Sequence, residues 1–145
     1  MLTIRPATLE DARYVGERLR VGDAAECAMF GLDGVRAIEE SIAASMSAEC
    51  LLIDGVPAAV FGMVMKDLMG TTGALWILTT DAIESNRIAY ARFARRQLER
   101  AFVLVDRLEN IVDVRYTRAM ALLEWLGFEF GPEHNGVRAF WKDKN

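Results

Sequence analysis

The chain has 145 residues, of which 52% are apolar, with a mean hydropathy of +0.14 and a formal net charge of −4. This length suits one domain, so we expect residues 1–145 to fold around a single core and to leave some apolar surface for a ligand or a second subunit. The longest apolar run, residues 56–65, is too short for a membrane-spanning helix, which needs about 20 residues, and the acidic balance argues against a nucleic-acid-binding surface over the whole domain.

The first half of the chain predicts a strand, two helices and a hairpin. Residues 2–5 alternate as a half-buried strand does, and Thr8 with Asp11 forms a capping box that starts a helix over residues 9–20. Residues 22–33 are small and punctuated by glycine, which indicates a short helical turn in a mobile connection, and residues 35–46 have amphipathic helical spacing. The Asp54-Gly55 pair between residues 50–53 and 58–65 predicts a tight β-hairpin.

The second half predicts a central strand, two helices and three further strands. Residues 74–80 form an apolar run suited to the centre of a sheet, and residues 86–104 have the longest helical pattern. A strand over 111–114 and a helix over 117–126 follow, with Gly127 as the helix C-cap. Strands over 128–130 and 137–141, joined by a turn over 131–136, close the chain. The order β-α-α-β-β-β-α-β-α-β-β requires a mixed sheet.

Charged and reactive side chains narrow the expectations further. Five arginines in one predicted helix form either a solvated face or an anion-binding site: Arg87, Arg92, Arg95, Arg96 and Arg100. Cys27 and Cys50 lie in no C-x-x-C pair, which favours two buried thiols over a disulfide. One histidine and two separate cysteines cannot form a His/Cys metal cluster, so we expect no metal. Residues 1–6 lack the layout of a signal peptide, and we expect a cytoplasmic protein.

The two ends of the chain carry recognisable motifs. It opens with Ile4-Arg5-Pro6-Ala7-Thr8-x-x-Asp11-Ala12 and closes with Leu122-x-x-x-Leu126-Gly127-Phe128-Glu129. With the element order, these motifs resemble the GNAT superfamily of acyl-CoA-dependent N-acyltransferases over nearly the whole chain. The resemblance implies a single-domain α/β (α+β) fold with a central, mixed, mostly antiparallel sheet flanked by helices. Residues 75–80 and a late Trp-Leu-Gly-Phe resemble, more loosely, phage proteins of the internal-virion-protein-A group, themselves related to GNATs.

The resemblance implies a site for acetyl-CoA or another acyl-CoA. In the superfamily the central strand splays from its neighbour and binds the pantetheine arm through main-chain groups, and the following loop and helix N-terminus hold the pyrophosphate. The implied positions are Ile77, Leu78, Thr79 and Thr80 for the arm, and Ser85, Asn86 and Arg87 for the pyrophosphate. The loop over residues 81–87 departs from the family because it has no glycine and carries two carboxylates. Ser85 or Asn86 can also serve simply as a helix cap.

The proton-transfer groups depart from the family as well. Many members have a tyrosine five residues before the Gly-Phe phenylalanine that protonates the departing thiolate, and this position is Leu123 here. Tyr116 is the nearest replacement, although it better fits the role of a half-buried aromatic residue at a helix N-terminus. Three candidate bases are chosen by their region of the chain alone: Asp113, Glu26 and Glu49. The single histidine, His134, fits an exposed turn better than a catalytic role.

Two functions stay open at this point. An acyltransferase would transfer an acyl group from CoA to an unidentified amine, with proximity supplying much of the rate even without the family tyrosine. The alternative is a non-catalytic GNAT-fold phage virion or assembly protein that has kept the scaffold and lost the cofactor loop. The enzyme would have acyl-CoA and an amine as partners, and the alternative would bind further copies of the chain or virion proteins. We expect neither nucleic acid nor membrane as a partner. The virion role would place the protein in a virion.

Overall fold

The computed structural model describes residues 1–145 as a single sheet with helices. Its elements are, in chain order, β1 (Leu2–Pro6), α1 (Leu9–Gly16), α2 (Val21–Met29), α3 (Gly34–Ala44), β2 (Ser47–Ile53), β3 (Val56–Met65), β4 (Thr72–Thr79), a 3₁₀ helix (Asp81–Asn86), α4 (Arg87–Leu104), β5 (Arg107–Asp113), α5 (Thr117–Trp125), β6 (Glu129–His134) and β7 (Val137–Asp143). The strand order is β1-β2-β3-β4-β5-β7-β6. The β4–β5 pair is parallel, whereas β1–β2, β2–β3, β5–β7 and β6–β7 are antiparallel. The predicted mixed, mostly antiparallel sheet flanked by helices is confirmed.

The chain divides into two compact units that interleave in the sequence. Unit 1 comprises residues 1–64 and 76–90, and unit 2 comprises residues 65–75 and 91–145. Strand β4 and helix α4 each contribute residues to both units. No helix has both the length and the apolar composition needed to cross a membrane, and no three His, Cys, Asp or Glu side chains gather where they could hold a metal ion.

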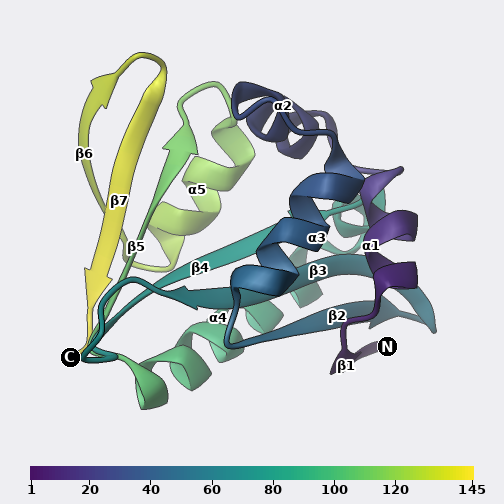
Figure 1. Cartoon of the computed structure of the whole chain (residues 1–145), viewed down its shortest axis with the longest axis horizontal. Coiled ribbons are helices and arrows are strands. Elements are labelled where there is room, and N and C mark those ends of the chain that lie inside the picture. The colour runs from purple at the N-terminus through teal and green to yellow at the C-terminus, as the bar shows by residue number, and fades with distance from the viewer. The chain divides into compact units, whose positions relative to one another are not determined.

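Unit 1 is organised by helices α1 and α3, which lie side by side across β2 and β3 (Figure 1). Its core contains the fully buried Ala12 and Val15 from α1, Ile38 from α3 and Val60 from β3. The predicted capping box is confirmed: the Thr8 side chain accepts a hydrogen bond from the Asp11 N–H, and the Asp11 carboxylate accepts one from the Thr8 N–H. Burial of these apolar faces supplies most of the driving force for this arrangement.

Helix α1 ends at Gly16, four residues before the predicted end at residue 20. The reason is the close approach of α3. A Cβ atom added at Gly34 would lie 2.3 Å from the Gly16 carbonyl oxygen, and one added at Gly16 would lie 2.5 Å from the Val35 nitrogen. The two backbones meet where neither has a side chain, so the chain leaves the helix at this contact, and Leu19 pairs instead with Thr80.

Helix α2 replaces the short helical turn predicted for residues 22–33, and this correction adds a helix to the expected order. It has nine residues and buries only Asp23 and Cys27. The prediction of two buried, free thiols is confirmed. Burial raises the pKa of Cys27 to about 11 and that of Cys50 to about 12, so both are protonated at neutral pH.

The predicted hairpin between β2 and β3 is confirmed. Asp54 and Gly55 have φ values of 50° and 82°, as a two-residue turn of type I′ requires. Asn135 and Gly136, at 52° and 83°, form the same kind of turn between β6 and β7. This second turn is shorter than predicted, because β6 continues past a register shift between Phe130 and Glu133 and runs to His134.

Unit 2 contains β5, β7 and β6 side by side, with α5 alongside them (Figure 1). Strand β5 starts at Arg107, four residues before the predicted strand, and pairs with β7 along its whole length. Helix α5 has Leu126 as its C-cap residue, and the predicted terminating glycine, Gly127, follows it with a left-handed φ of 93°. Phe128 and Phe140 pack edge to face with ring centroids 5.2 Å apart.

Candidate functional site

Regular pairing between β4 and β5 ends soon after it begins. The parallel register joins Thr72 to Arg107 and Gly73 to Leu108. Two residues later the Leu75 carbonyl accepts a hydrogen bond from the Asn110 side-chain amide, at 2.8 Å, and the Asn110 side-chain oxygen accepts one from the Ile111 N–H, also at 2.8 Å. A side chain thus takes the position of a main-chain partner. Asn110 fixes the point at which the two strands stop forming a ladder.

Main-chain groups of β4 alternate in direction along the strand. The Lys66 main-chain N–H donates to the Thr72 carbonyl, and the Thr80 N–H donates to the Ala58 carbonyl, so even-numbered positions face β3. Odd-numbered positions therefore direct their N–H and C=O groups to the other side. Ile77 lies on this side, between Leu75 and Thr79. Of the four predicted arm-binding residues, Ile77 and Thr79 have main-chain groups with this direction.

Thr79 is held by residues from the start of α2. Its N–H donates to the Asp23 carboxylate at 2.9 Å, and its carbonyl accepts from the Arg20 N–H at 2.9 Å. Its hydroxyl donates to the Asp23 carboxylate and accepts from Arg20 Nε at 2.6 Å. Arg20 also pairs with Glu84, at 2.9 Å. Both main-chain groups of Thr79 are therefore engaged within unit 1. We call Arg20, Asp23, Thr79 and Glu84 the Thr79 clamp.

The other predicted arm-binding residues have different surroundings. The Thr80 N–H is paired with β3, and the Thr80 hydroxyl accepts from the Ala82 N–H, which starts the 3₁₀ helix. Leu78 packs against the core of unit 1. Thr80 and Leu78 are therefore engaged in the fold of unit 1. Ile77 is left as the position best suited to hydrogen-bond an extended ligand through its main chain.

The predicted pyrophosphate residues lie on the 3₁₀ helix and at the start of α4. Ser85 and Arg87 are exposed, whereas the Asn86 side chain donates to the Ala82 carbonyl at 2.9 Å. Glu84, one of the two carboxylates expected to repel a pyrophosphate, is paired with Arg20. The ion pair reduces the negative potential of this segment, so Ser85 and Arg87 can meet an anion.

The two predicted catalytic residues, Asp113 and Tyr116, are brought together at the start of α5. The Tyr116 N–H donates to the Asp113 carbonyl at 3.0 Å, and the Tyr116 hydroxyl is buried. Arg115 binds the Asp113 carboxylate through its guanidinium at 2.7 and 3.1 Å and through its own N–H at 2.9 Å. The hydrogen bond from the Arg115 side chain lowers the pKa of Asp113, which makes it a weak proton acceptor near neutral pH. This favours a turn-organising role for Asp113.

The remaining candidates lie apart from this pair in the chain. Glu26 lies on α2, Glu49 on β2, and His134 is exposed at the end of β6. The position of the family tyrosine is the half-buried Leu123 on α5.

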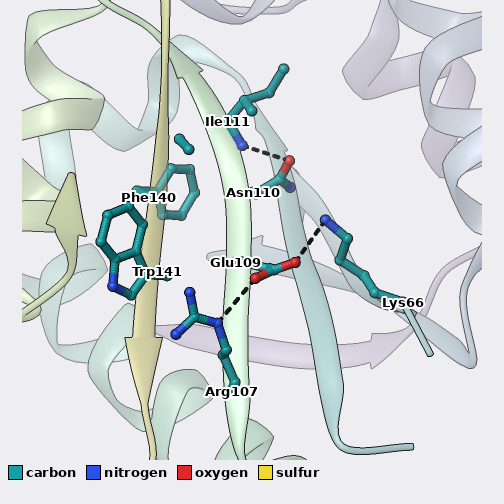
Figure 2. Close-up of a pocket in the computed structure, with 8 residues that line it drawn as sticks. Lys66, Arg107, Glu109, Asn110, Ile111, Phe140 and Trp141 are labelled. Carbon is teal, nitrogen blue, oxygen red and sulfur yellow. Dashed lines mark hydrogen bonds and ion pairs between the residues drawn. The ribbon is translucent and has the colours of Figure 1, made fainter. Parts of the chain in front are cut away.

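A pocket of about 410 Å³ lies on the β5–β7 part of unit 2 (Figure 2). The Glu109 carboxylate lies between Arg107 at 3.0 Å and Lys66 at 3.1 Å, and the Trp141 ring lies beside them. The hydrogen bond from Arg107, then the one from Lys66, lowers the pKa of Glu109. Arg107 also pairs with Asp143 at 3.1 Å, so each charged side chain of the pocket has a partner, and Ile111 and Trp141 supply an apolar wall.

Three residues that shape the candidate site escaped the sequence analysis. Asn110 ends the β4–β5 ladder, and Arg20 and Asp23 engage Thr79. Asn110 is a polar residue between the buried Leu108 and Val112 at alternate positions of β5, a usable signal for a break in pairing. Arg20 and Asp23 precede Thr79 by more than fifty residues, and no local pattern connects them to it.

Comparisons with known proteins place this geometry in context. No family model and no curated protein matches the sequence. A chimera of the spermidine N-acetyltransferase SpeG from Vibrio cholerae and hSSAT matches with a TM-score of 0.73 and 15% identity, covering 98% of this chain and 95% of that one. A GNAT-family acetyltransferase from Bacillus anthracis matches with a TM-score of 0.72 and 14% identity, covering 98% and 94%.

A third structure, the aminoglycoside acetyltransferase AAC(6′)-Ib in complex with coenzyme A, has a TM-score of 0.70 and 14% identity and covers 99% of this chain and 95% of that one. These matches lend no support to the looser resemblance to phage internal-virion proteins. They cover 98–99% of this chain with TM-scores of 0.70–0.73. The chain therefore has the fold of the GNAT acetyltransferases.

Proposed function

We propose that the protein is an acyl-CoA-dependent N-acyltransferase, which transfers an acetyl or other acyl group to an amine. Its fold is shared with proteins described as spermidine and aminoglycoside acetyltransferases, one of them in complex with coenzyme A. The single observation that carries the proposal is the end of β4–β5 pairing after Gly73 and Leu108, fixed by Asn110. A strand whose ladder ends early retains main-chain groups that can hydrogen-bond an extended, amide-containing ligand.

The residues present fit an acyl-CoA at two places. Ile77 would bind the pantetheine arm through its main chain. Ser85 and Arg87, both exposed, would bind the pyrophosphate through side chains. A guanidinium supplies paired, charge-assisted hydrogen bonds to phosphate oxygens, so it can substitute for glycine-rich backbone.

The proposed reaction needs few groups from the protein. The amine nitrogen attacks the thioester carbonyl carbon, a C–N bond forms and the C–S bond breaks. The attacking nitrogen gives up a proton, and the departing thiolate takes one up to leave as a thiol. Tyr116 is the proposed proton donor to the thiolate. Asp113, through its contacts with Arg115 and Tyr116, is the proposed organiser of the turn that carries this hydroxyl. Positioning of the two substrates accounts for most of the rate.

Acetyl-CoA binding tests the proposal directly. Saturation at about 100 times Kd should stabilise the fold by about 2.7 kcal/mol, visible as a rise in Tm. Arg87→Ala should weaken binding about 10- to 100-fold in calorimetry, because it removes charge-assisted bonds to phosphate. Arg96→Ala is the matched control, since Arg96 is an exposed arginine nine positions later on the same helix. Equal losses in both variants would dismiss the proposed pyrophosphate site.

A non-catalytic GNAT-fold protein is the second candidate, and one observation favours it. Both main-chain groups of Thr79 are hydrogen-bonded within unit 1, which shortens the segment of β4 that a ligand can reach. Failure of millimolar acetyl-CoA to raise Tm in the wild-type protein and in variants of the Thr79 clamp would select this candidate. Cytoplasmic localisation, self-association and a virion role stay predictions.

A further inference from the structure

The Thr79 clamp is a buried charged cluster at the end of β4. Thr79 is 1% exposed and Asp23 is 4% exposed, while the Arg20 side chain is 13% exposed. Arg20 Nε lies 3.8 Å from the Asp23 carboxylate, and its other end pairs with Glu84. Burial raises the pKa of the Tyr90 hydroxyl, and Asp23 raises it further while Arg20 opposes the change, so Tyr90 shares this environment.

Holding a helix in place with such a cluster carries a large desolvation free energy. Buried charges lose hydration, and an apolar contact of similar volume often stabilises a fold equally well or better. The clamp also engages the strand end that an acyl-CoA arm would use. Both features are expected if the contact has a role beyond stability.

Helix α2 buries few side chains. Only Asp23 and Cys27 are buried among its nine residues, and Val21, Met29 and Phe30 are exposed. Its N-cap residue, Arg20, makes no side-chain capping bond. Gly31, with a φ of 72°, follows the helix. Segments with few buried apolar contacts open at low free energy, so the buried hydrogen bonds of the clamp weigh heavily in holding α2.

We propose that α2 is a self-inhibitory latch: Asp23 and Arg20 hold the Thr79 N–H and C=O that an acyl-CoA arm would otherwise bind, so latching and full occupation of β4 exclude each other. The inference rests on the proposed acyl-CoA binding. A ligand that pairs with Ile77 alone leaves the latch closed. A ligand that extends to Thr79 must release Asp23 and Arg20, and α2 then moves away from the strand.

Substitution of Asp23 separates a latch from a merely structural contact. Asp23→Asn keeps the size of the side chain and removes the charge that strengthens its bonds to Thr79. The latch predicts that acetyl-CoA binds this variant about tenfold more tightly than it binds wild type, because less free energy is spent on release. Asp11→Asn is the matched control. Asp11 is likewise buried, at 3% exposed, and is bonded to an arginine, Arg5, but it caps α1 rather than contacting β4.

Cysteine labelling reports the motion itself. Cys27 lies on α2 and Cys50 lies in β2, and both are buried. Saturating acetyl-CoA should accelerate alkylation of Cys27 at least several-fold, while Cys50 should stay protected. Ligand binding normally protects a fold, so faster labelling of one thiol alone identifies local release. Peptide mapping by mass spectrometry distinguishes the two cysteines.

The outcomes are distinguishable. Tighter acetyl-CoA binding by Asp23→Asn than by wild type, with faster Cys27 labelling in wild type, supports both the acyltransferase and the latch. Acetyl-CoA binding by Asp23→Asn but not by wild type also supports both. Equal affinity of Asp23→Asn and wild type, with Cys27 protected by acetyl-CoA, overturns the latch and leaves the acyltransferase standing. Equal weakening in Asp23→Asn and Asp11→Asn likewise overturns the latch, because it shows a structural effect. Absence of binding in wild type and in Asp23→Asn overturns both.

Discussion

Asn110 is the residue on which the shape of the candidate site depends most. Its amide donates to the Leu75 carbonyl and its oxygen accepts from the Ile111 N–H, so one side chain satisfies groups on two strands. Asn110→Asp keeps the acceptor and replaces the donor with a second oxygen facing the Leu75 carbonyl. We expect the free energy of unfolding to fall by about 1–3 kcal/mol, measured by urea denaturation.

Asn135→Asp provides the comparison for this substitution. Asn135 lies in the β6–β7 turn at a φ of 52°, a conformation that aspartate also tolerates. Its effect should stay within about 0.5 kcal/mol. If Asn110→Asp proved equally mild, the end of the β4–β5 ladder would have to be fixed by something other than this side chain.

The packing of helix α1 against helix α3 depends on two glycines, Gly16 and Gly34. A Cβ atom at Gly34 would lie 2.3 Å from the Gly16 carbonyl oxygen and 2.7 Å from Leu19 Cδ1. Alanine favours a helix over glycine by about 1 kcal/mol, yet backbone cannot yield to this clash. We expect Gly34→Ala to lower the free energy of unfolding by about 1–3 kcal/mol in urea denaturation. Glu39→Ala, at an exposed position of α3, should change it by less than about 0.5 kcal/mol; a stabilised Gly34→Ala would refute the close contact.

Elements with local signals were predicted, and elements set by distant contacts were not. The Thr8–Asp11 capping box and the Asp54-Gly55 turn depend on neighbours in sequence, and both are present. The early end of α1 depends on Gly34, eighteen residues after Gly16, which local spacing cannot reveal. Helix α2 was predicted only as a short turn because Gly22, Gly31 and Gly34 read as loop punctuation, although Ala24, Ala25 and Ala28 within it favour a helix.

At the scale of the whole molecule, the fold was predictable from element order, while the site was predictable only in part. Alternation and helical spacing repeat along each element, so many residues support each inference. The state of Thr79 depends instead on two residues, Arg20 and Asp23, that precede it by 59 and 56 positions. Contacts of this kind follow from the folded chain and leave no periodic trace in the sequence.

The stability of the whole molecule should fall in acid, and the sign follows from its carboxylates. Burial would raise the pKa of Asp11, but the Arg5 and Thr8 hydrogen bonds outweigh it and lower that pKa, and hydrogen bonding also lowers the pKa of Asp67, Glu109 and Asp113. The unfolded chain therefore binds more protons than the native state below about pH 5. The stabilisation from these groups is fully present above their ordinary pKa of about 4 and is lost as the pH falls through their lower native values.

Urea denaturation of wild type and Asp11→Asn over a pH series checks this expectation. At pH 7 the variant should be less stable by about 1–3 kcal/mol, because it loses the charge that binds Arg5, and Asp11 is only 3% exposed. The difference should narrow as the pH falls below about 4, since wild-type Asp11 is then protonated and loses the same interaction. A difference that stayed constant down to pH 2 would mean that Asp11 stabilises the fold through its shape and capping geometry, with its charge contributing nothing.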